Sequence, residues 1–203
     1  MRTALFGGTF DPPHRGHIAV ARAAADSFHL DRVLFAPAGR QPLKPGATST
    51  SFHARFAMVT LAAQVDARFA ASALDEPRTD GSPNFTVDTL AALQSAGAPG
   101  DELFCITGAD AFLDLHRWRE PERLLTLAEW IVVSRPGFSM ESLATLRLLP
   151  PQFARVHLLE TVHEDVSATQ LRAALERGED VDADLPPGVG AYIRQNHLYQ
   201  PVL

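Results

Sequence analysis

The sequence Gly7-Gly8-Thr9-Phe10-Asp11-Pro12-Pro13-His14-Arg15-Gly16-His17 connects a predicted strand to a predicted helix. It follows an apolar run, Ala4-Leu5-Phe6, which predicts a buried first strand. It precedes a helical pattern in which apolar residues recur at steps of three and four from Ile18 to Phe28. Two glycines and two histidines are therefore expected on a turn between a strand and a helix. In an open parallel sheet such a turn lies at the carboxyl end of the strand, where these folds bind ligands.

The residues of this turn suit a phosphate group. Gly7 and Gly8 have no side chain, so a ligand can approach the backbone closely. His17 falls near the N-terminus of the predicted helix, where free N–H groups and the helix dipole favour an anion. His14 and His17 are three residues apart and can face one ligand if the turn is close to helical. Gly16 between them leaves room for a phosphate.

The same histidines allow a second interpretation, a zinc site. Asp11, His14 and His17 carry atoms that can ligate zinc, and a His-x-x-His pair can also be purely structural. The sequence contains no His-Glu-x-x-His motif and no second cluster of His and Cys at metal-ligand spacing. A metal hydrolase is therefore the less favoured interpretation, and we expect no metal held by protein side chains.

Composition narrows the class of protein. The chain has 203 residues, of which 46% are hydrophobic, enough for a sizeable core in one domain. Its formal net charge of −6 disfavours nonspecific binding to nucleic acid. Cys105 is the single cysteine, which excludes an internal disulfide and suits a reducing compartment. We find no leader pattern and no apolar run of about eighteen residues, so we expect a cytoplasmic protein with no membrane and no nucleic-acid partner.

Short apolar runs alternate with helical patterns along the rest of the chain. The runs cover residues 32–36, 69–72, 103–107, 130–133 and 155–159. The helical patterns cover 51–63, 84–93, 141–149, 167–178 and 189–197, and Pro150 and Pro151 are expected to end the third of these. This alternation predicts an α/β fold, a Rossmann-like doubly wound parallel sheet of five to six strands with helices on both faces. We expect a single domain over residues 1–203, with a core of about 1–165 and a small helical C-terminal segment of about 166–203.

Cations and hydroxyls occur in segments that follow the predicted strands. Arg40 and Lys44 lie in a loop rich in Pro and Gly, where they either stay solvated or reach a phosphate. Arg55 lies beside the apolar stripe of the 51–63 helix, so we expect it on the surface. Ser167 and Gln170 form a capping-box pattern that opens the 167–178 helix.

The start of that helix can also bind an anion. Ser167, Thr169 and free backbone N–H groups make a second anion site, which Arg172 can reach from one turn further along. Gly178 fits the C-cap of the same helix. Because the carboxyl ends of parallel strands gather at one edge of a sheet, we expect these groups near the histidine pair. The sequence has neither Gly-x-Gly-x-x-Gly nor a P-loop motif, which argues against an ordinary dehydrogenase and against a P-loop NTPase.

A further group of residues suits a flat ring carrying a phosphate. Asp110 follows a glycine at the end of a predicted strand, and Trp118 lies eight residues after it. The face of Trp118 can stack on a flat ring of a ligand, or the side chain can simply pack in the core. Arg135 ends another strand, where its side chain can meet a phosphate. Asn84 or Thr86 either caps the helix that begins there or, in the case of Thr86, contacts the ligand.

Several of these segments resemble one known family. The stretch from Gly7 to His17 resembles the signature of the nucleotidyltransferase superfamily that carries a His-x-Gly-His motif, and its longer string is most similar to the bacterial nicotinate mononucleotide adenylyltransferases. Residues 166–172 resemble the second signature of that family, Ile-Ser-Ser-Thr-x-x-Arg. Residues 82–86, 108–118 and 135–137 are similar to family segments as well. Three residues depart from the family pattern, namely Leu43 in place of His, Phe85 in place of Tyr, and Ala168 in place of Ser.

The resemblance implies an enzyme of NAD biosynthesis that transfers AMP from ATP to nicotinate mononucleotide, giving nicotinate adenine dinucleotide (deamido-NAD) and pyrophosphate. It implies that His14 and His17 are catalytic and contact the phosphates of ATP. The residues that it assigns to ATP and its phosphates are Gly7, Gly8, Thr9, Phe10, Gly16, Lys44, Ser167, Thr169 and Arg172. Those that it assigns to the nicotinate nucleotide are Thr86, Asp110, Trp118 and Arg135. Mg²⁺ is implied as the cofactor, bridging oxygens of ATP.

Two other functions and the oligomeric state stay open. The acceptor can be a different one, such as nicotinamide mononucleotide or a phosphopantetheine. The chain can also be a nucleotide-binding regulator that kept the fold and lost turnover, although His14, His17, Ser167 and Arg172 are all present. Either a monomer or a homo-oligomer agrees with the sequence.

Overall fold

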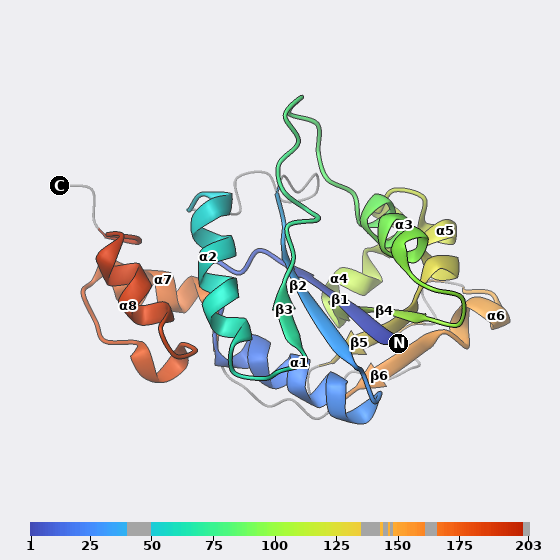
Figure 1. Cartoon of the computed structure of the whole chain (residues 1–203), viewed down its shortest axis with the longest axis horizontal. Coiled ribbons are helices and arrows are strands. Elements are labelled where there is room, and N and C mark those ends of the chain that lie inside the picture. The colour runs from blue at the N-terminus through green and yellow to red at the C-terminus, as the bar shows by residue number, and fades with distance from the viewer. Residues whose placement is uncertain (40–49, 135–142, 144–145, 147, 161–165, 201–203) are drawn as a thin grey trace.

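The computed structural model describes residues 1–39, 50–134, 143, 146, 148–160 and 166–200 (Figure 1). The first half of the chain contains β1 (Arg2–Gly8), α1 (Arg15–Ser27), β2 (Arg32–Pro37), α2 (Phe52–Ala63), β3 (Phe69–Ala71) and α3 (Thr86–Ala96). The second half contains β4 (Glu102–Gly108), α4 (Ala109–Leu113), the 3-10 helix η1 (Leu115–Arg117), α5 (Pro121–Leu127), β5 (Glu129–Val133), α6 (Pro150–Phe153), β6 (Val156–Leu159), α7 (Ala168–Glu176), the 3-10 helix η3 (Asp182–Asp184) and α8 (Val189–Gln195).

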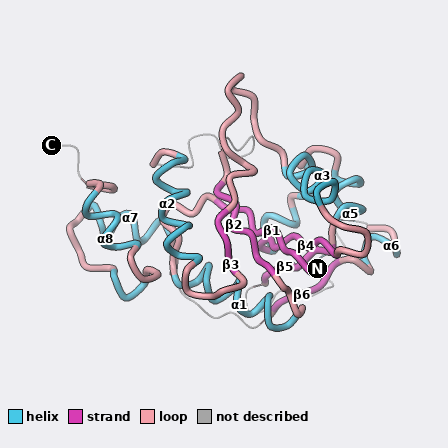
Figure 2. Tube along the Cα trace, in the orientation of Figure 1, coloured by secondary structure: helices cyan, strands magenta, loops and turns pink. Residues whose placement is uncertain are grey.

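The strands form one sheet in the order β3-β2-β1-β4-β5-β6, and every neighbouring pair is parallel (Figure 2). Phe6 of β1 is level with Phe35 of β2 and with Ile106 of β4. The predicted Rossmann-like parallel sheet is confirmed. The strand order reverses direction between β1 and β4, and ligands of such sheets bind beyond the carboxyl ends of the strands at that reversal.

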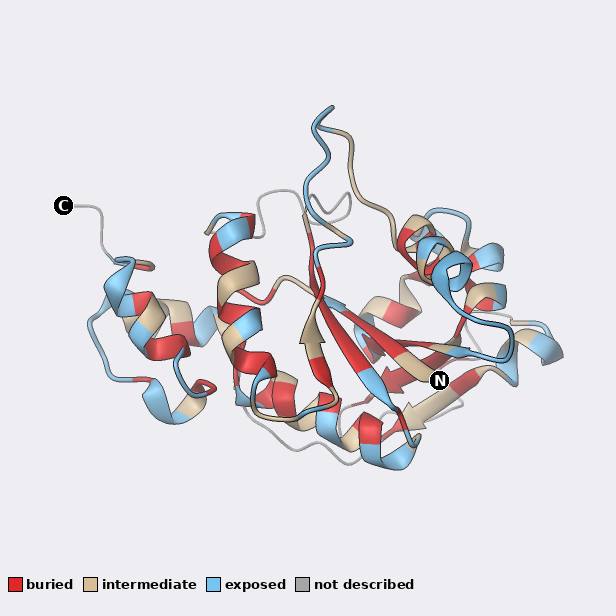
Figure 3. Ribbon diagram, viewed as in Figure 1, coloured by how far each residue is buried: buried red, intermediate tan, exposed pale blue. Residues whose placement is uncertain are grey.

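Two apolar cores lie on opposite faces of the sheet, because successive side chains of a strand point to opposite sides. Phe6 and Ile106 belong to one core, which also holds apolar side chains of α1, α2, α7 and α8. Leu5 and Cys105 belong to the other, which holds side chains of α3, α4 and α5. The central strands are buried between these layers (Figure 3). This burial on both faces explains why the strands appear in the sequence as continuous apolar runs.

Three features of the middle of the chain differ from the sequence prediction. Five of the nine residues of the helix expected at 141–149 lie outside the described residues. Pro150 and Pro151 begin α6 instead of ending a helix, since the first turn of a helix accepts proline. The short helices α4 and α5 were not predicted, because five and seven residues are too few for a helical period to stand out.

The C-terminal segment follows the prediction more closely. Helices α7 and α8 are present, and Gly178 follows α7 with a φ of 74°, in the left-handed region that favours glycine. Both helices lie beyond α2, on the side of the molecule away from α3 and α5 (Figure 1). In the described part of the chain, we find no helix with the length and apolar character needed to cross a membrane.

Candidate active site

The turn after β1 combines an open glycine with a buried phenylalanine. Apart from its chain neighbours, a Cβ atom on Gly7 would meet no atom of a described residue within 4 Å, so space lies beside the backbone there. A Cβ atom on Gly8 would lie 3.0 Å from Cζ of Phe10, which leaves little room for a side chain. Phe10 is fully buried with a φ of 49° and packs edge-on against Phe6, with their ring centroids 5.5 Å apart. The aromatic ring therefore fixes the course of the turn, while Gly7 leaves one side of it accessible.

The two histidines meet at the start of α1. His14 is the N-cap residue of the helix, and the centroids of the two rings lie 3.7 Å apart. The backbone N–H of His14 donates to Nδ1 of His17 at 3.2 Å. Since Nδ1 of His17 accepts this hydrogen bond, the neutral ring carries its proton on Nε2. His17 thus offers one N–H donor in a fixed tautomer.

Both histidines are held in the neutral form at pH 7. Burial lowers the pKa of His14 from its usual 6.5 to about 4, although the carboxylate of Asp184 acts in the opposite direction. Burial, and then the neighbouring His14, hold the pKa of His17 well below its usual value. The Nδ1 atom of His14 is buried and has no hydrogen-bond partner among the described residues. An unsatisfied buried group of this kind calls for an explanation, and a bound ligand is one.

The start of α7 lies against the same turn. The guanidinium of Arg172 donates from Nη1 to the backbone oxygen of Asp11 at 2.7 Å and from Nη2 to Oγ1 of Thr169 at 3.4 Å. Ser167 is the N-cap residue of α7, but its side chain makes no capping hydrogen bond, so the predicted capping box with Gln170 is wrong. Ser167 and Thr169 are exposed to solvent instead. Arg172 therefore ties the start of α7 to the turn that carries the histidine pair.

A buried polar network beneath the turn was not predicted. Oδ1 of Asp11 accepts hydrogen bonds from Oγ1 of Thr50 at 2.5 Å and from the hydroxyl of Tyr199 at 2.6 Å. Nη1 of Arg55 donates to the backbone oxygen of Thr9 at 2.8 Å. The surface position expected for Arg55 is wrong, since the residue is only 2% exposed. The sequence did hold a signal, because Arg55 follows Phe52 by three positions on the apolar side of α2.

Three of the residues predicted to hold the nicotinate nucleotide, Thr86, Asp110 and Trp118, lie around the turn after β4 and the start of α3. Asp110 is exposed in the first turn of α4. Trp118 is half-buried, and its ring packs edge-on against Trp130 with centroids 6.0 Å apart. Core packing therefore accounts for the buried part of Trp118 and leaves the rest of the ring accessible.

Arg119, directly after Trp118, connects the segment that follows β4 to the start of α3. The guanidinium carbon of Arg119 lies 4.6 Å from the centroid of the Phe85 ring. Phe85 is the N-cap residue of α3 and makes no side-chain capping bond, so neither Asn84 nor Thr86 is the cap. Asn84 instead donates from Nδ2 to the backbone oxygen of Glu76 at 3.0 Å.

Other predicted residues fall outside the described part of the chain. They are Arg40, Leu43, Lys44 and Arg135. The described residues contain no group of three His, Cys, Asp or Glu that could hold a metal ion. The zinc interpretation of Asp11, His14 and His17 gains no support, because the Asp11 carboxylate faces Thr50 and Tyr199.

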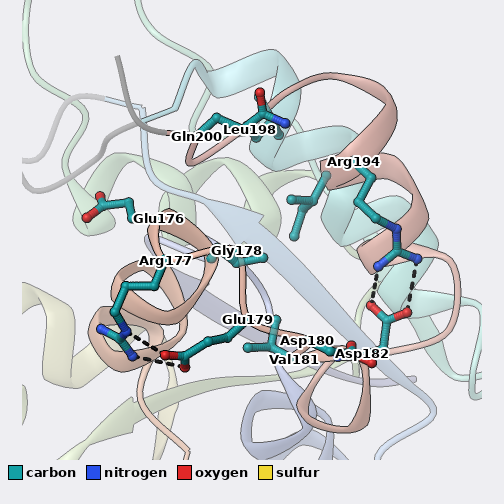
Figure 4. A pocket seen from close by; sticks show the side chains of 12 residues that line it. Glu176, Arg177, Gly178, Glu179, Asp180, Val181, Asp182, Arg194, Leu198 and Gln200 are labelled. Carbon is teal, nitrogen blue, oxygen red and sulfur yellow. Dashed lines mark hydrogen bonds and ion pairs between the residues drawn. The ribbon is translucent and has the colours of Figure 1, made fainter. Parts of the chain in front are cut away.

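A surface hollow of about 730 Å³ between α7 and α8 is separate from these residues (Figure 4). Arg177 pairs with Glu179 in its lining, and Arg194 pairs with Asp182 through two hydrogen bonds. No predicted site residue lines the hollow. The candidate site is therefore the region beyond the carboxyl ends of β1 and β4.

A parallel sheet of this order with two helix starts beside a histidine pair is the architecture of a nucleotidyltransferase. Residues 5–174 match the family model described as Cytidylyltransferase-like. A probable nicotinate-nucleotide adenylyltransferase of Solibacter usitatus is 39% identical over 199 residues, which cover 98% of this chain and 100% of that protein. One of Leifsonia xyli is 41% identical over 201 residues, covering 99% and 95%. The chain belongs to the nicotinate-nucleotide adenylyltransferase family, which confirms the resemblance and the enzyme class indicated by the sequence.

The fold is shared with solved structures as well. The structure of Plasmodium falciparum nicotinic acid mononucleotide adenylyltransferase complexed with NaAD has a TM-score of 0.76 at 19% sequence identity, covering 98% of this chain and 97% of that chain. A putative nicotinate-nucleotide adenylyltransferase from Vibrio parahaemolyticus has a TM-score of 0.66 at 20% identity, covering 100% and 97%. These similarities show that the architecture persists where most residues differ.

Proposed function

We propose that this protein transfers AMP from ATP to nicotinate mononucleotide, with release of pyrophosphate. The observation that carries the proposal is the meeting of the histidine pair with Arg172 across Asp11, at the point where the sheet reverses its strand order. In the reaction, a phosphate oxygen of nicotinate mononucleotide bonds to the α-phosphorus of ATP. The bond from that phosphorus to the bridging oxygen breaks, and pyrophosphate leaves with the electron pair. The products are deamido-NAD and pyrophosphate, a step of NAD biosynthesis.

The chemistry needs positioning and charge stabilisation more than proton transfer. The acceptor phosphate is already ionised, so no general base is required, and phosphoryl-type transfers are catalysed largely by orientation and electrostatics. His14 and His17 are neutral and can donate hydrogen bonds to phosphate oxygens as charge develops on the leaving group. Arg172, with the hydroxyls of Ser167 and Thr169, would hold the outer phosphates.

The remaining phosphate contacts come from the turn after β1. Gly7 would let ATP approach the backbone, and Gly8, Thr9, Phe10 and Gly16 would complete the turn around it. Lys44 would add a cation from the loop after β2. The side of Gly7 left open by the protein is the place where we expect the nucleotide to lie.

The acceptor would occupy the adjoining region beyond β4. Trp118 would stack on the pyridine ring with the accessible part of its indole. Asp110 and Thr86 would contact the nucleotide, and Arg135 would meet its phosphate. A carboxylate on the ring distinguishes nicotinate from nicotinamide, and backbone N–H groups near Thr86 can recognise that charge.

Magnesium would enter with ATP as part of the substrate. The described residues offer no cluster of three acidic or histidine ligands, which suits an ion held mainly by phosphate oxygens and water. We also propose that residues 1–203 form a single domain, since apolar side chains of α7 and α8 share a core with Phe10 and Ile18. The proposed location of the protein is the cytoplasm.

A paired assay of pyrophosphate release tests the proposed function. Purified protein receives Mg-ATP with either nicotinate mononucleotide or nicotinamide mononucleotide. We expect much faster release with the nicotinate form, and deamido-NAD as the product. Equal rates would remove the claim of specificity for nicotinate but keep the transferase. No release with either acceptor would overturn the proposed function.

A further inference from the structure

We propose that Tyr199 is a positioning residue of the active site, which acts through Asp11 to hold the turn that carries His14 and His17. The inference rests on the proposed function and deepens it. It assigns a role in ATP recognition to the C-terminal end of the chain, far in sequence from the residues that it supports.

The first step is the contact itself. The hydroxyl of Tyr199 donates to Oδ1 of Asp11 at 2.6 Å, and Thr50 donates to the same oxygen at 2.5 Å. Asp11 is 0% exposed, and Tyr199 is buried as well. A buried carboxylate is stable only where hydrogen bonds and charges compensate for its lost hydration, so both hydroxyls stabilise Asp11 in this position.

The second step is the charge beneath the turn. Arg55 is 2% exposed, donates to the backbone oxygen of Thr9 and is attracted to the carboxylate of Asp11. Burial lowers the pKa of Arg55, whereas Asp11 and Tyr199 raise it. Burial and the hydrogen bond to Asp11 raise the pKa of Tyr199, so its hydroxyl stays protonated and donates. Hydrogen bonds from Arg55 of α2 and from Tyr199 thus both hold the turn.

The third step links this network to the phosphate groups. The backbone oxygen of Asp11 accepts from Arg172, while its side chain accepts from Tyr199. His14 lies three residues further along the same turn. A displacement of Asp11 would therefore move both the histidine pair and the guanidinium of Arg172. A shift of about 1 Å at catalytic groups can cost roughly a hundredfold in rate.

The segment that carries Tyr199 is held by contacts of its own. Leu198 donates its N–H to the backbone oxygen of Ile193 at 3.1 Å, and Tyr199 follows with a φ of 58°. Ile193 and Tyr199 belong to the same apolar core as Phe10. The tyrosine hydroxyl is therefore presented to Asp11 by a structured segment.

The test compares the two tyrosines of the chain. Tyr199→Phe removes the hydroxyl and keeps the ring, and Tyr192→Phe, in α8, is the matched control, because Tyr192 is half-exposed and its hydroxyl makes no hydrogen bond to another described residue. Three quantities are measured for each variant: kcat, the KM for each substrate, and the Kd of Mg-ATP by titration calorimetry without acceptor. Assays are run well below the unfolding midpoint of every variant.

For Tyr199→Phe we expect kcat/KM for Mg-ATP to fall by about tenfold, while the KM for nicotinate mononucleotide stays within about twofold of wild type. Tyr192→Phe should match wild type in every quantity. Thr50→Val, which removes the other hydroxyl on Asp11, should give the same pattern and serves if Tyr199→Phe does not fold.

Wild-type values for Tyr199→Phe, or a loss that follows only the folded fraction, would overturn the proposal. A loss confined to the KM for nicotinate mononucleotide would overturn it too. If the wild-type protein transfers nothing to nicotinate mononucleotide, the proposed function fails instead. The Kd of Mg-ATP then decides the role of Tyr199, because it needs no acceptor: a value raised about tenfold in Tyr199→Phe supports the role and an unchanged value rejects it.

Discussion

The turn after β1 and the turn after β4 lie side by side at the reversal of the strand order, yet they are built differently. The first is tied to α2, to α7 and to the C-terminal residues by buried hydrogen bonds through Thr9 and Asp11. The second begins with the open Gly108 and places Asp110 on the surface. We infer from this difference that the turn after β1, where we propose the phosphates bind, is preorganised by the protein. The turn after β4, where we propose the acceptor binds, instead exposes residues that a ligand can reach directly.

The largest expected effect is on the preorganised side. His17→Ala should lower kcat by roughly a thousandfold, because removing one donor that stabilises developing charge costs 10²- to 10³-fold. The unfolding midpoint should change little in comparison. Initial rates of pyrophosphate release measure the effect, with His53→Ala, an exposed position on α2, as the control. Near-normal turnover of His17→Ala would contradict the proposed role.

Matched aspartates test the contrast in stability. Asp11→Ala should reduce the free energy of unfolding by about 3–5 kcal/mol, because it leaves Arg55 buried without its compensating charge. Asp110→Ala should change the free energy of unfolding by less than about 0.5 kcal/mol, since Asp110 is exposed. It should instead weaken the binding of nicotinate mononucleotide. Urea unfolding measures both. Equal losses of stability in the two variants would remove the distinction between the turns.

These two aspartates also show what the sequence could predict. The apolar runs identified every strand of the sheet, because each run is a local pattern. The histidine motif and the helix start at Ser167 are local patterns too, and from them we predict the phosphate end of the site. The network around Asp11 was missed because its members are far apart, with Tyr199 188 residues away from Asp11. No local pattern reports that a tyrosine or an arginine has a buried partner in another element.

The neutral histidines give the phosphate end a pH dependence. The pKa of His14 is about 4 in the folded protein and 6.5 in its ordinary state, so the unfolded chain binds more protons between these values. The contribution of His14 to the free energy of unfolding is therefore fully present above pH 6.5. About 3 kcal/mol of it is lost as the pH falls from 6.5 towards 4. His17 adds a loss in the same direction.

Urea unfolding at a series of pH values measures this slope. His14→Asn should flatten the dependence between pH 6.5 and 4, whereas His53→Asn should leave it as in wild type. The lowered pKa of Asp66, at about 2, affects only the range below this window. A wild-type curve without slope from pH 6.5 to 4 would show that the histidines are not buried in the neutral form.

Gly7 tests the space left for ATP. A Cβ atom there meets no protein atom, so Gly7→Ala should keep the free energy of unfolding within about 0.5 kcal/mol of wild type. The added methyl group should raise the KM for Mg-ATP by roughly tenfold, because it enters space that the nucleotide needs. Gly97→Ala, after α3, is the control. An unchanged KM would place ATP away from this strand end.

The smallest expected effect concerns the acceptor side. Trp118→Leu should raise the KM for nicotinate mononucleotide by about fivefold, since stacking of aromatic rings contributes about 0.5–1.5 kcal/mol. The KM for Mg-ATP should stay close to wild type. Steady-state kinetics with each substrate varied in turn measures the split. If the free energy of unfolding falls and both KM values are unchanged, Trp118 only packs against Trp130 in the core and does not contact the substrate.

Isothermal titration calorimetry of Mg-ATP binding to the protein, without acceptor, tests directly whether the phosphate end of the site is preorganised. A phosphate site that the protein has already assembled around His14, His17 and Arg172 should bind Mg-ATP without nicotinate mononucleotide, and His17→Ala should keep most of that binding while losing turnover. Binding of Mg-ATP that appears only after nicotinate mononucleotide is added would contradict the claim that the phosphate end is preorganised.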